Sequence, residues 1–84
     1  MTRTEIQLVA VYGPAVPLDA VCEPYFGLQV DNAQRLAAKN ALPVPTFRLR
    51  ESLKCPLMVK AADLAAWIDT THEQALASWQ KSQL

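Results

Sequence analysis

The sequence contains few of the residues that build cofactor, metal or disulfide sites. Its 84 residues include two glycines, two cysteines and one histidine. Gly13 and Gly27 are isolated, so there is no glycine-rich loop to hold a phosphate. Cys22 and Cys55 are too few for a disulfide framework, and His72 is too far from both for zinc spacing. We therefore expect two reduced, buried or half-buried thiols, and no cofactor or metal.

Long apolar runs and catalytic groupings are missing as well. No stretch approaches the roughly 18 apolar residues that a membrane span needs, and the first residues lack the features of a signal peptide. His72 has no nucleophile placed near it by the pattern. Asp63 and Asp69 are more simply solubilising charges than an acid/base pair. These observations predict a cytoplasmic protein that is not an enzyme and does not bind membranes.

The charges are distributed unevenly although the net charge is zero. Residues 32–60 hold six basic residues and one acidic residue, a net charge of +5, whereas the rest holds two basic and seven acidic residues, a net charge of −5. A contiguous basic third indicates an anionic partner. With 51% hydrophobic residues, the chain has the length and composition of one small domain spanning residues 1–84.

Residues 31–42 are the central element of our interpretation, since their pattern predicts a short amphipathic helix. Asp31 is the expected N-cap, Gln34 completes a capping box, and Pro43 ends the helix. One face carries small or apolar residues, and the opposite face is polar and basic. The apolar face consists of Ala33, Leu36, Ala37 and Ala41, and the polar face of Asn32, Arg35 and Lys39. That polar face is either an ordinary solvated surface or a surface that contacts DNA bases and phosphates.

The preceding chain predicts a partner for this helix. Residues 6–12 are apolar and rich in β-branched side chains, which favours a short strand, although so short a run also fits one or two turns of helix. Residues 18–25 have helical spacing, with Pro24 expected to kink or shorten the helix near its end. Gly27 occupies a turn position that often needs positive φ. A helix, a glycine-containing turn and a second helix form a helix-turn-helix.

After the second helix the pattern changes to alternation. Residues 46–50 predict a strand with Phe47 and Leu49 on one face and Arg48 and Arg50 on the other. A loop follows, and residues 57–60 predict a return strand. The resulting basic hairpin is either a DNA-binding wing or a plain surface hairpin that covers the core.

The last segment predicts a long helix over residues 61–80. Leu64, Trp67 and Ile68 are expected to bury against the first helix and the hairpin. Leu76 and Trp79 extend beyond so small a core. Residues 72–84 therefore either fold back onto the domain or form an oligomerisation extension.

Several segments resemble the pyocin activator (PrtN-like) proteins of bacteria and their prophages. Residues 16–27, VPLDAVCEPYFG, resemble the opening of that family, and residues 8–13 its apolar lead-in. Residues 42–49, LPVPTFRL, followed by Glu51-Ser52, resemble its wing strand, and residues 64–69, LAAWID, its last helix. Residues 54–58 depart from the polar, glycine-bearing wing tip that is usual there. The layout is also similar to the winged-helix excisionases and Cox-type regulators of temperate phages.

Together the residues and the resemblance lead to an α+β fold, a small winged helix-turn-helix domain with a short N-terminal strand, two helix-turn-helix helices, a β-hairpin wing and a C-terminal helix. The resemblance implies a sequence-specific regulator of transcription that binds double-stranded DNA. We expect a homodimer or cooperative homo-oligomer on DNA, with an integrase or RNA polymerase as a further protein partner. The expected DNA contacts are Asn32, Gln34 and Arg35 to bases, and Lys39, Arg48, Arg50 and Lys54 to phosphates or the minor groove.

Two alternatives remain open at this point. An excisionase that bends DNA for an integrase would use the same scaffold. A phage-encoded adaptor or inhibitor would turn the same basic surface towards an acidic protein.

Overall fold

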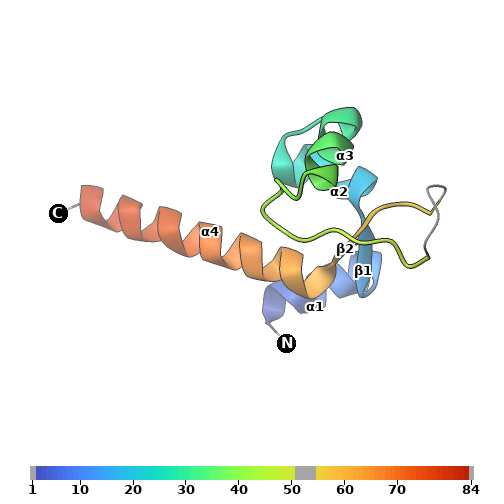
Figure 1. The fold of residues 1–84 in the computed structure, drawn as a ribbon. Coiled ribbons are helices and arrows are strands. Elements are labelled where there is room, and N and C mark those ends of the chain that lie inside the picture. The colour runs from blue at the N-terminus through green and yellow to red at the C-terminus, as the bar shows by residue number, and fades with distance from the viewer. Residues whose placement is uncertain (1, 51–54, 84) are drawn as a thin grey trace.

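The computed structural model describes residues 2–50 and 55–83. Within these residues the chain is a small α+β structure with four helices and one two-stranded antiparallel sheet (Figure 1). In chain order the elements are α1 (Arg3–Tyr12), β1 (Ala15–Pro17), α2 (Leu18–Phe26), α3 (Val30–Ala38), β2 (Met58–Lys60) and α4 (Ala61–Ser82). None of the described helices combines the length and the hydropathy of a membrane-spanning segment.

The N-terminal segment is a helix, so the predicted N-terminal strand is wrong. The Thr2 side chain caps α1 by accepting a hydrogen bond from the Glu5 backbone N–H at 3.1 Å. Leu8 is buried, and Val9 and Tyr12 are half-buried against the core. This spacing of buried residues has the period of a helix, whereas a strand would bury every second residue. The inner face of α1 packs against α4, and this contact between distant segments decides the conformation.

Helix α2 confirms the helix predicted over residues 18–25 and extends it by one residue to Phe26. Pro24 lies inside its last turn. Gly27 follows in the left-handed conformation, with φ of 67°, as its turn position predicted. The Leu28 N–H donates to the Cys22 carbonyl at 3.0 Å and closes the turn. The chain thereby reverses within three residues and brings α3 against α2.

Helix α3 is shorter at its C-terminus than predicted, and its predicted capping box does not form. Gln29 rather than Asp31 is the N-cap, since the half-buried Val30 already belongs to the helix. Asp31 instead lies in the first turn, where a carboxylate complements the helix dipole.

The predicted C-terminal end of α3 is also wrong. The helix ends at a Schellman motif, well before Pro43. Asn40 is left-handed, with φ of 54°, and donates its N–H to the Ala37 carbonyl at 3.0 Å. The Ala41 N–H donates to the Leu36 carbonyl at 2.9 Å. Ala41 consequently lies outside the helix and is exposed rather than part of the buried face.

The sheet is formed mainly by strands that are distant in the sequence. Val16 of β1 lies opposite Val59 of β2, and both are fully buried. On the other side of β2, Met58 forms a single bridge with Phe47 through hydrogen bonds of 3.0 and 2.7 Å. The predicted return strand is therefore present as β2, but the predicted strand over residues 46–50 is reduced to this bridge. Leu49 is 70% exposed, so the core does not extend far enough to cover a longer strand.

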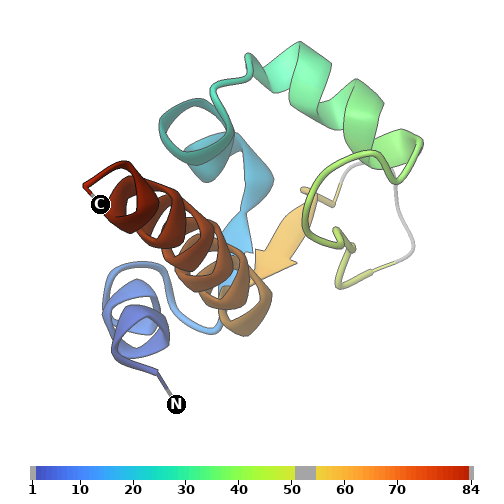
Figure 2. The same ribbon diagram turned by 90° about the vertical axis from the view of Figure 1, so that its left-hand side faces the viewer.

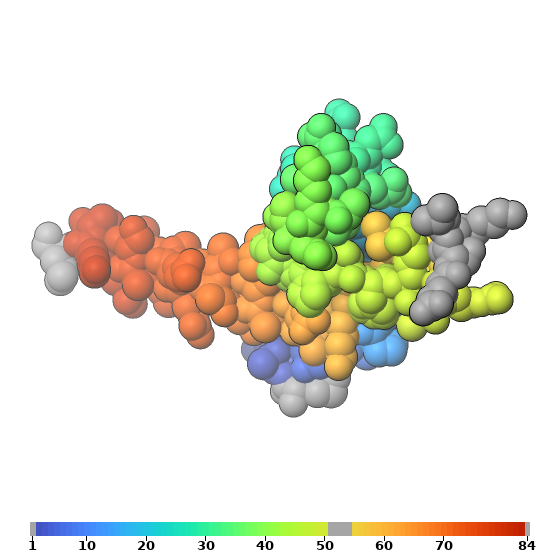
Figure 3. All heavy atoms as spheres, in the orientation of Figure 1, coloured from blue at the N-terminus to red at the C-terminus, as the bar shows by residue number. Residues whose placement is uncertain are grey.

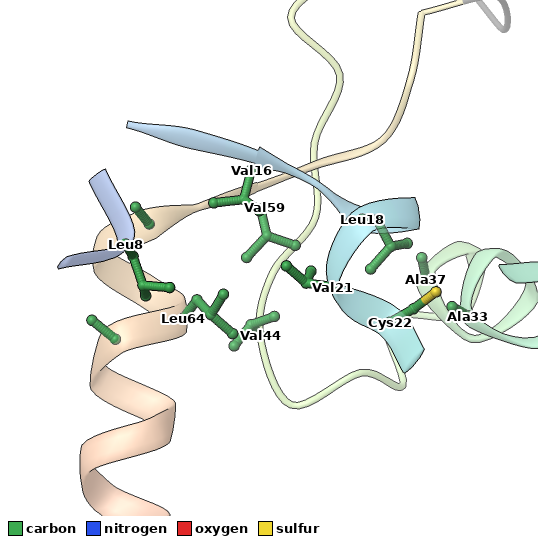
Figure 4. Packing of buried hydrophobic residues seen from close by; sticks show 12 residues of the cluster. Leu8, Val16, Leu18, Val21, Cys22, Ala33, Ala37, Val44, Val59 and Leu64 are labelled. Atoms are coloured by element: carbon green, nitrogen blue, oxygen red, sulfur yellow. The ribbon is translucent and has the colours of Figure 1, made fainter. Parts of the chain in front are cut away.

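The first half of α4 completes the core, as predicted. Leu64 is fully buried among side chains from α1, both strands, α2 and the segment after α3 (Figure 4). Trp67 and Ile68 are half-buried. The ring centroids of Trp67 and of Phe26 on α2 lie 5.0 Å apart, and the two rings are tilted relative to each other. Figure 2 shows α1 on one side of α4 and the pair α2 and α3 on the other. Residues 70–83 are exposed, and this half of α4 projects away from the core.

Candidate nucleic-acid interface

The outer face of α3 presents the polar and basic side chains that the helical pattern predicted. Asn32, Arg35 and Lys39 are all exposed. On the opposite face Ala33 and Ala37 are buried in the core. Because alanine has a short side chain, this face lies close against α2 and leaves the outer face free. Figure 3 shows α3 and the segment that follows it on one side of the molecule.

Two of these outer side chains contact each other. The Arg35 guanidinium donates a hydrogen bond from Nη2 to Oδ1 of Asn32 over 3.3 Å. The two residues are three positions apart, a spacing that places side chains on the same face of a helix. Helical periodicity predicted that both residues lie on one face, but it did not predict this contact between them.

Gln34 contacts Asp19, a residue outside the predicted site. Its Nε2 donates to Oδ1 of Asp19, on α2, over 3.3 Å. The contact joins exposed parts of α2 and α3. Asp19 is distant in sequence and belongs to another helix, so only the packing of α2 on α3 reveals this contact.

The second group of basic residues lies on the segment that leads to β2. Arg48 is exposed and donates from Nε to the Cys55 carbonyl over 3.1 Å, which connects the two arms of this segment. Arg50 is exposed, and so is Lys60 at the end of β2. Lys54 lies outside the described residues. The Arg35 guanidinium donates to the amide oxygen of Asn32, and that of Arg48 donates to the backbone carbonyl of Cys55. Neither of these two acceptors carries a charge.

Both cysteines are free, Cys22 being buried and Cys55 half-buried, as predicted. Among the described residues, no three His, Cys, Asp or Glu side chains are grouped so that they could hold a metal ion. The chemistry that the described site offers is therefore hydrogen bonding and positive charge.

These features define a small α+β protein with a closely packed helix pair and an exposed polar and basic helix face. The chain belongs to the family described as pyocin activator protein PrtN, whose model matches residues 4–75. This match confirms the resemblance noted in the sequence. Neither the curated proteins nor the solved structures provide a match to the chain.

Proposed function

We propose that this protein is a sequence-specific DNA-binding activator of transcription that acts on phage or prophage genes. Membership of the pyocin activator family supports the role. The observation that carries DNA binding is the construction of α3, with alanines packed inward and Asn32, Arg35 and Lys39 outward. A helix with this outer face presents donors to base edges and phosphates when it lies in the major groove.

In this proposal the fold is a winged helix-turn-helix. Helices α2 and α3 with the turn at Gly27 form the helix-turn-helix, and α3 is the recognition helix. The order of elements supports this assignment, because β2 has β1 on one side and the Phe47 bridge on the other. The segment between Phe47 and Met58 is then the wing, and its base is tied by the hydrogen bond from Arg48 to Cys55.

The predicted contacts have different roles. Arg35 contacts a guanine, with Asn32 and Gln34 beside it, while Lys39, Arg48, Arg50 and Lys54 hold phosphates or enter the minor groove. The proposal involves no catalytic step and no cofactor.

One α3 reaches only a few base pairs, so we propose that two or more copies bind together. The candidate contact is the projecting half of α4, where Leu76 is 40% and Trp79 is 60% exposed. In an antiparallel pair of these helices, Leu76 of each copy would pack against Trp79 of the other, as a two-fold interface requires.

Duplex affinity measured across a salt series tests DNA binding. A protein that neutralises about five phosphates should lose affinity with a log–log slope of about −4 to −5. A flat response, or no duplex binding, would instead favour the adaptor that binds an acidic protein. Footprinting on host and phage DNA then tests the role, because sites beside promoters fit an activator and sites flanking an attachment sequence fit an excisionase.

A further inference from the structure

We propose that Asn32 is a positioning residue for Arg35, and that the two side chains read one guanine together instead of reading two bases separately. This inference rests on the proposed DNA-binding function and deepens it. It replaces the expectation, drawn from side-chain type alone, that Asn32 and Arg35 each contact a base of their own.

The contact between the two side chains fixes the orientation of the asparagine amide. The guanidinium carries N–H donors and no acceptor, so the amide atom that faces it must be the oxygen. Asn32 Oδ1, 3.3 Å from Arg35 Nη2, is the oxygen that an asparagine needs to accept a hydrogen bond from adenine N6. Arg35 engages one of the two lone pairs of this oxygen, so an adenine contact would have to share the oxygen with a bond that is already present.

Arg35 keeps the donors that a guanine contact requires. Its guanidinium has five N–H groups, and one of them is used by Asn32. A bidentate contact to guanine O6 and N7 needs two more, which remain available. Because an arginine side chain loses much rotamer freedom when it is fixed, a bond that holds it before DNA arrives favours binding.

The position of Gln34 supports the assignment of this pair as a unit. Gln34 is directed to Asp19 on α2 and is occupied there. The matched control is Gln29, an exposed amide side chain at the N-cap of the same helix that is not among the proposed DNA contacts.

The test is a double-mutant cycle read out as base preference at each position of the bound site. We expect Arg35→Ala to reduce discrimination at one G·C pair by about 5- to 150-fold, the range of one bidentate contact. Asn32→Ala should reduce discrimination at the same base pair. The double variant should be no worse than Arg35→Ala by more than about twofold, because the two residues act on one contact. Gln29→Ala should leave discrimination at that pair unchanged.

Asn32→Asp separates positioning from direct reading. Aspartate retains an oxygen that accepts from Arg35 but has no amide N–H for a base. We expect this variant to keep the preference at the G·C pair, while its added negative charge lowers affinity for all sequences alike.

The inference is overturned if Asn32→Ala changes preference at a different base pair and its effect adds to that of Arg35→Ala. Loss of the G·C preference in Asn32→Asp would also overturn it. In both cases the unmodified chain still binds duplex DNA, and the proposed function stands. If the unmodified chain does not bind duplex DNA, the proposed function and this inference fail together.

Discussion

Two residues in left-handed conformations determine where α2 and α3 end. Gly27 follows α2 with φ of 67°, and Asn40 follows α3 with φ of 54°. The glycine was predictable because it stands at the end of a helical pattern and has no Cβ to oppose positive φ. Asn40 was not predicted, because the nearby Pro43 offered a more familiar stop signal. Asparagine is the residue other than glycine that adopts this conformation most readily.

Substitutions at Gly27 test the backbone requirement of this turn. A Cβ at Gly27 meets no atom within 4 Å, so only backbone strain opposes an alanine there. Gly27→Ala should lower the free energy of unfolding by about 1–2 kcal/mol, measured by urea denaturation. Gly27→Asn is the matched control and should cost less, because its side chain tolerates the left-handed region. Equal losses in both variants would contradict this explanation.

Substitutions at Arg35 and Lys39 test the proposal that Arg35 contacts a base and Lys39 contacts phosphate. Arg35→Ala should weaken binding to the specific site by about 1–3 kcal/mol and relax sequence preference. Lys39→Ala should weaken all sequences about equally and reduce the salt slope by about 1. Competition binding with specific and random duplexes at several salt concentrations measures both effects. Indistinguishable profiles for the two variants would refute this proposal.

At the scale of whole elements, the helices and helix faces that follow from local apolar spacing were predictable from the sequence. Helix α2 and the beginning of α4 follow their apolar spacing, and the polar face of α3 follows from helical periodicity. Elements that depend on partners distant in the sequence could not be predicted in this way. Helix α1 is helical because it packs on α4, and β2 takes β1 as its main partner, so the alternation over residues 46–50 did not produce a strand. The contacts of Asn32 and Gln34 also depend on which neighbour folding provides, and pattern alone does not specify it.

Substitutions at Thr4 test whether the hydrogen bond between α1 and α4 stabilises the fold. Thr4 Oγ1 donates to Oδ1 of the half-buried Asp69 over 2.6 Å. Thr4→Val keeps the shape but removes the donor, so we expect a loss of about 1.5–3 kcal/mol in the free energy of unfolding, the range for a hydrogen bond to a carboxylate. Thr4→Ser retains the hydroxyl and should lose less. Denaturation curves for Thr4→Val that coincide with those of the unmodified protein would exclude a stabilising role for this bond.

At the scale of the molecule, the chain separates a compact core from a projecting helix. The described structure measures 52 × 26 × 17 Å, and its long dimension comes largely from α4 (Figure 1). Isolated helical segments this short gain little stability in water without packing an apolar face. Residues 70–82 are nevertheless helical and exposed, with Leu76 and Trp79 among them. This arrangement favours an interface with a second copy over a tail that folds back onto the domain.

Replacement of the two exposed apolar side chains of α4 distinguishes these possibilities. Leu76→Ala together with Trp79→Ala should abolish self-association and cooperative binding to DNA carrying two adjacent sites, and should leave affinity for a single site unchanged. The free energy of unfolding should change by less than about 0.5 kcal/mol, because neither side chain belongs to the core or packs against it in the monomer. Sedimentation with and without DNA, together with urea denaturation, measures these quantities. Gln80→Ala, on the same half of α4, serves as a control that keeps both apolar side chains. A destabilised double variant would indicate a tail packed on its own domain, and unchanged cooperativity would place the contact between copies elsewhere.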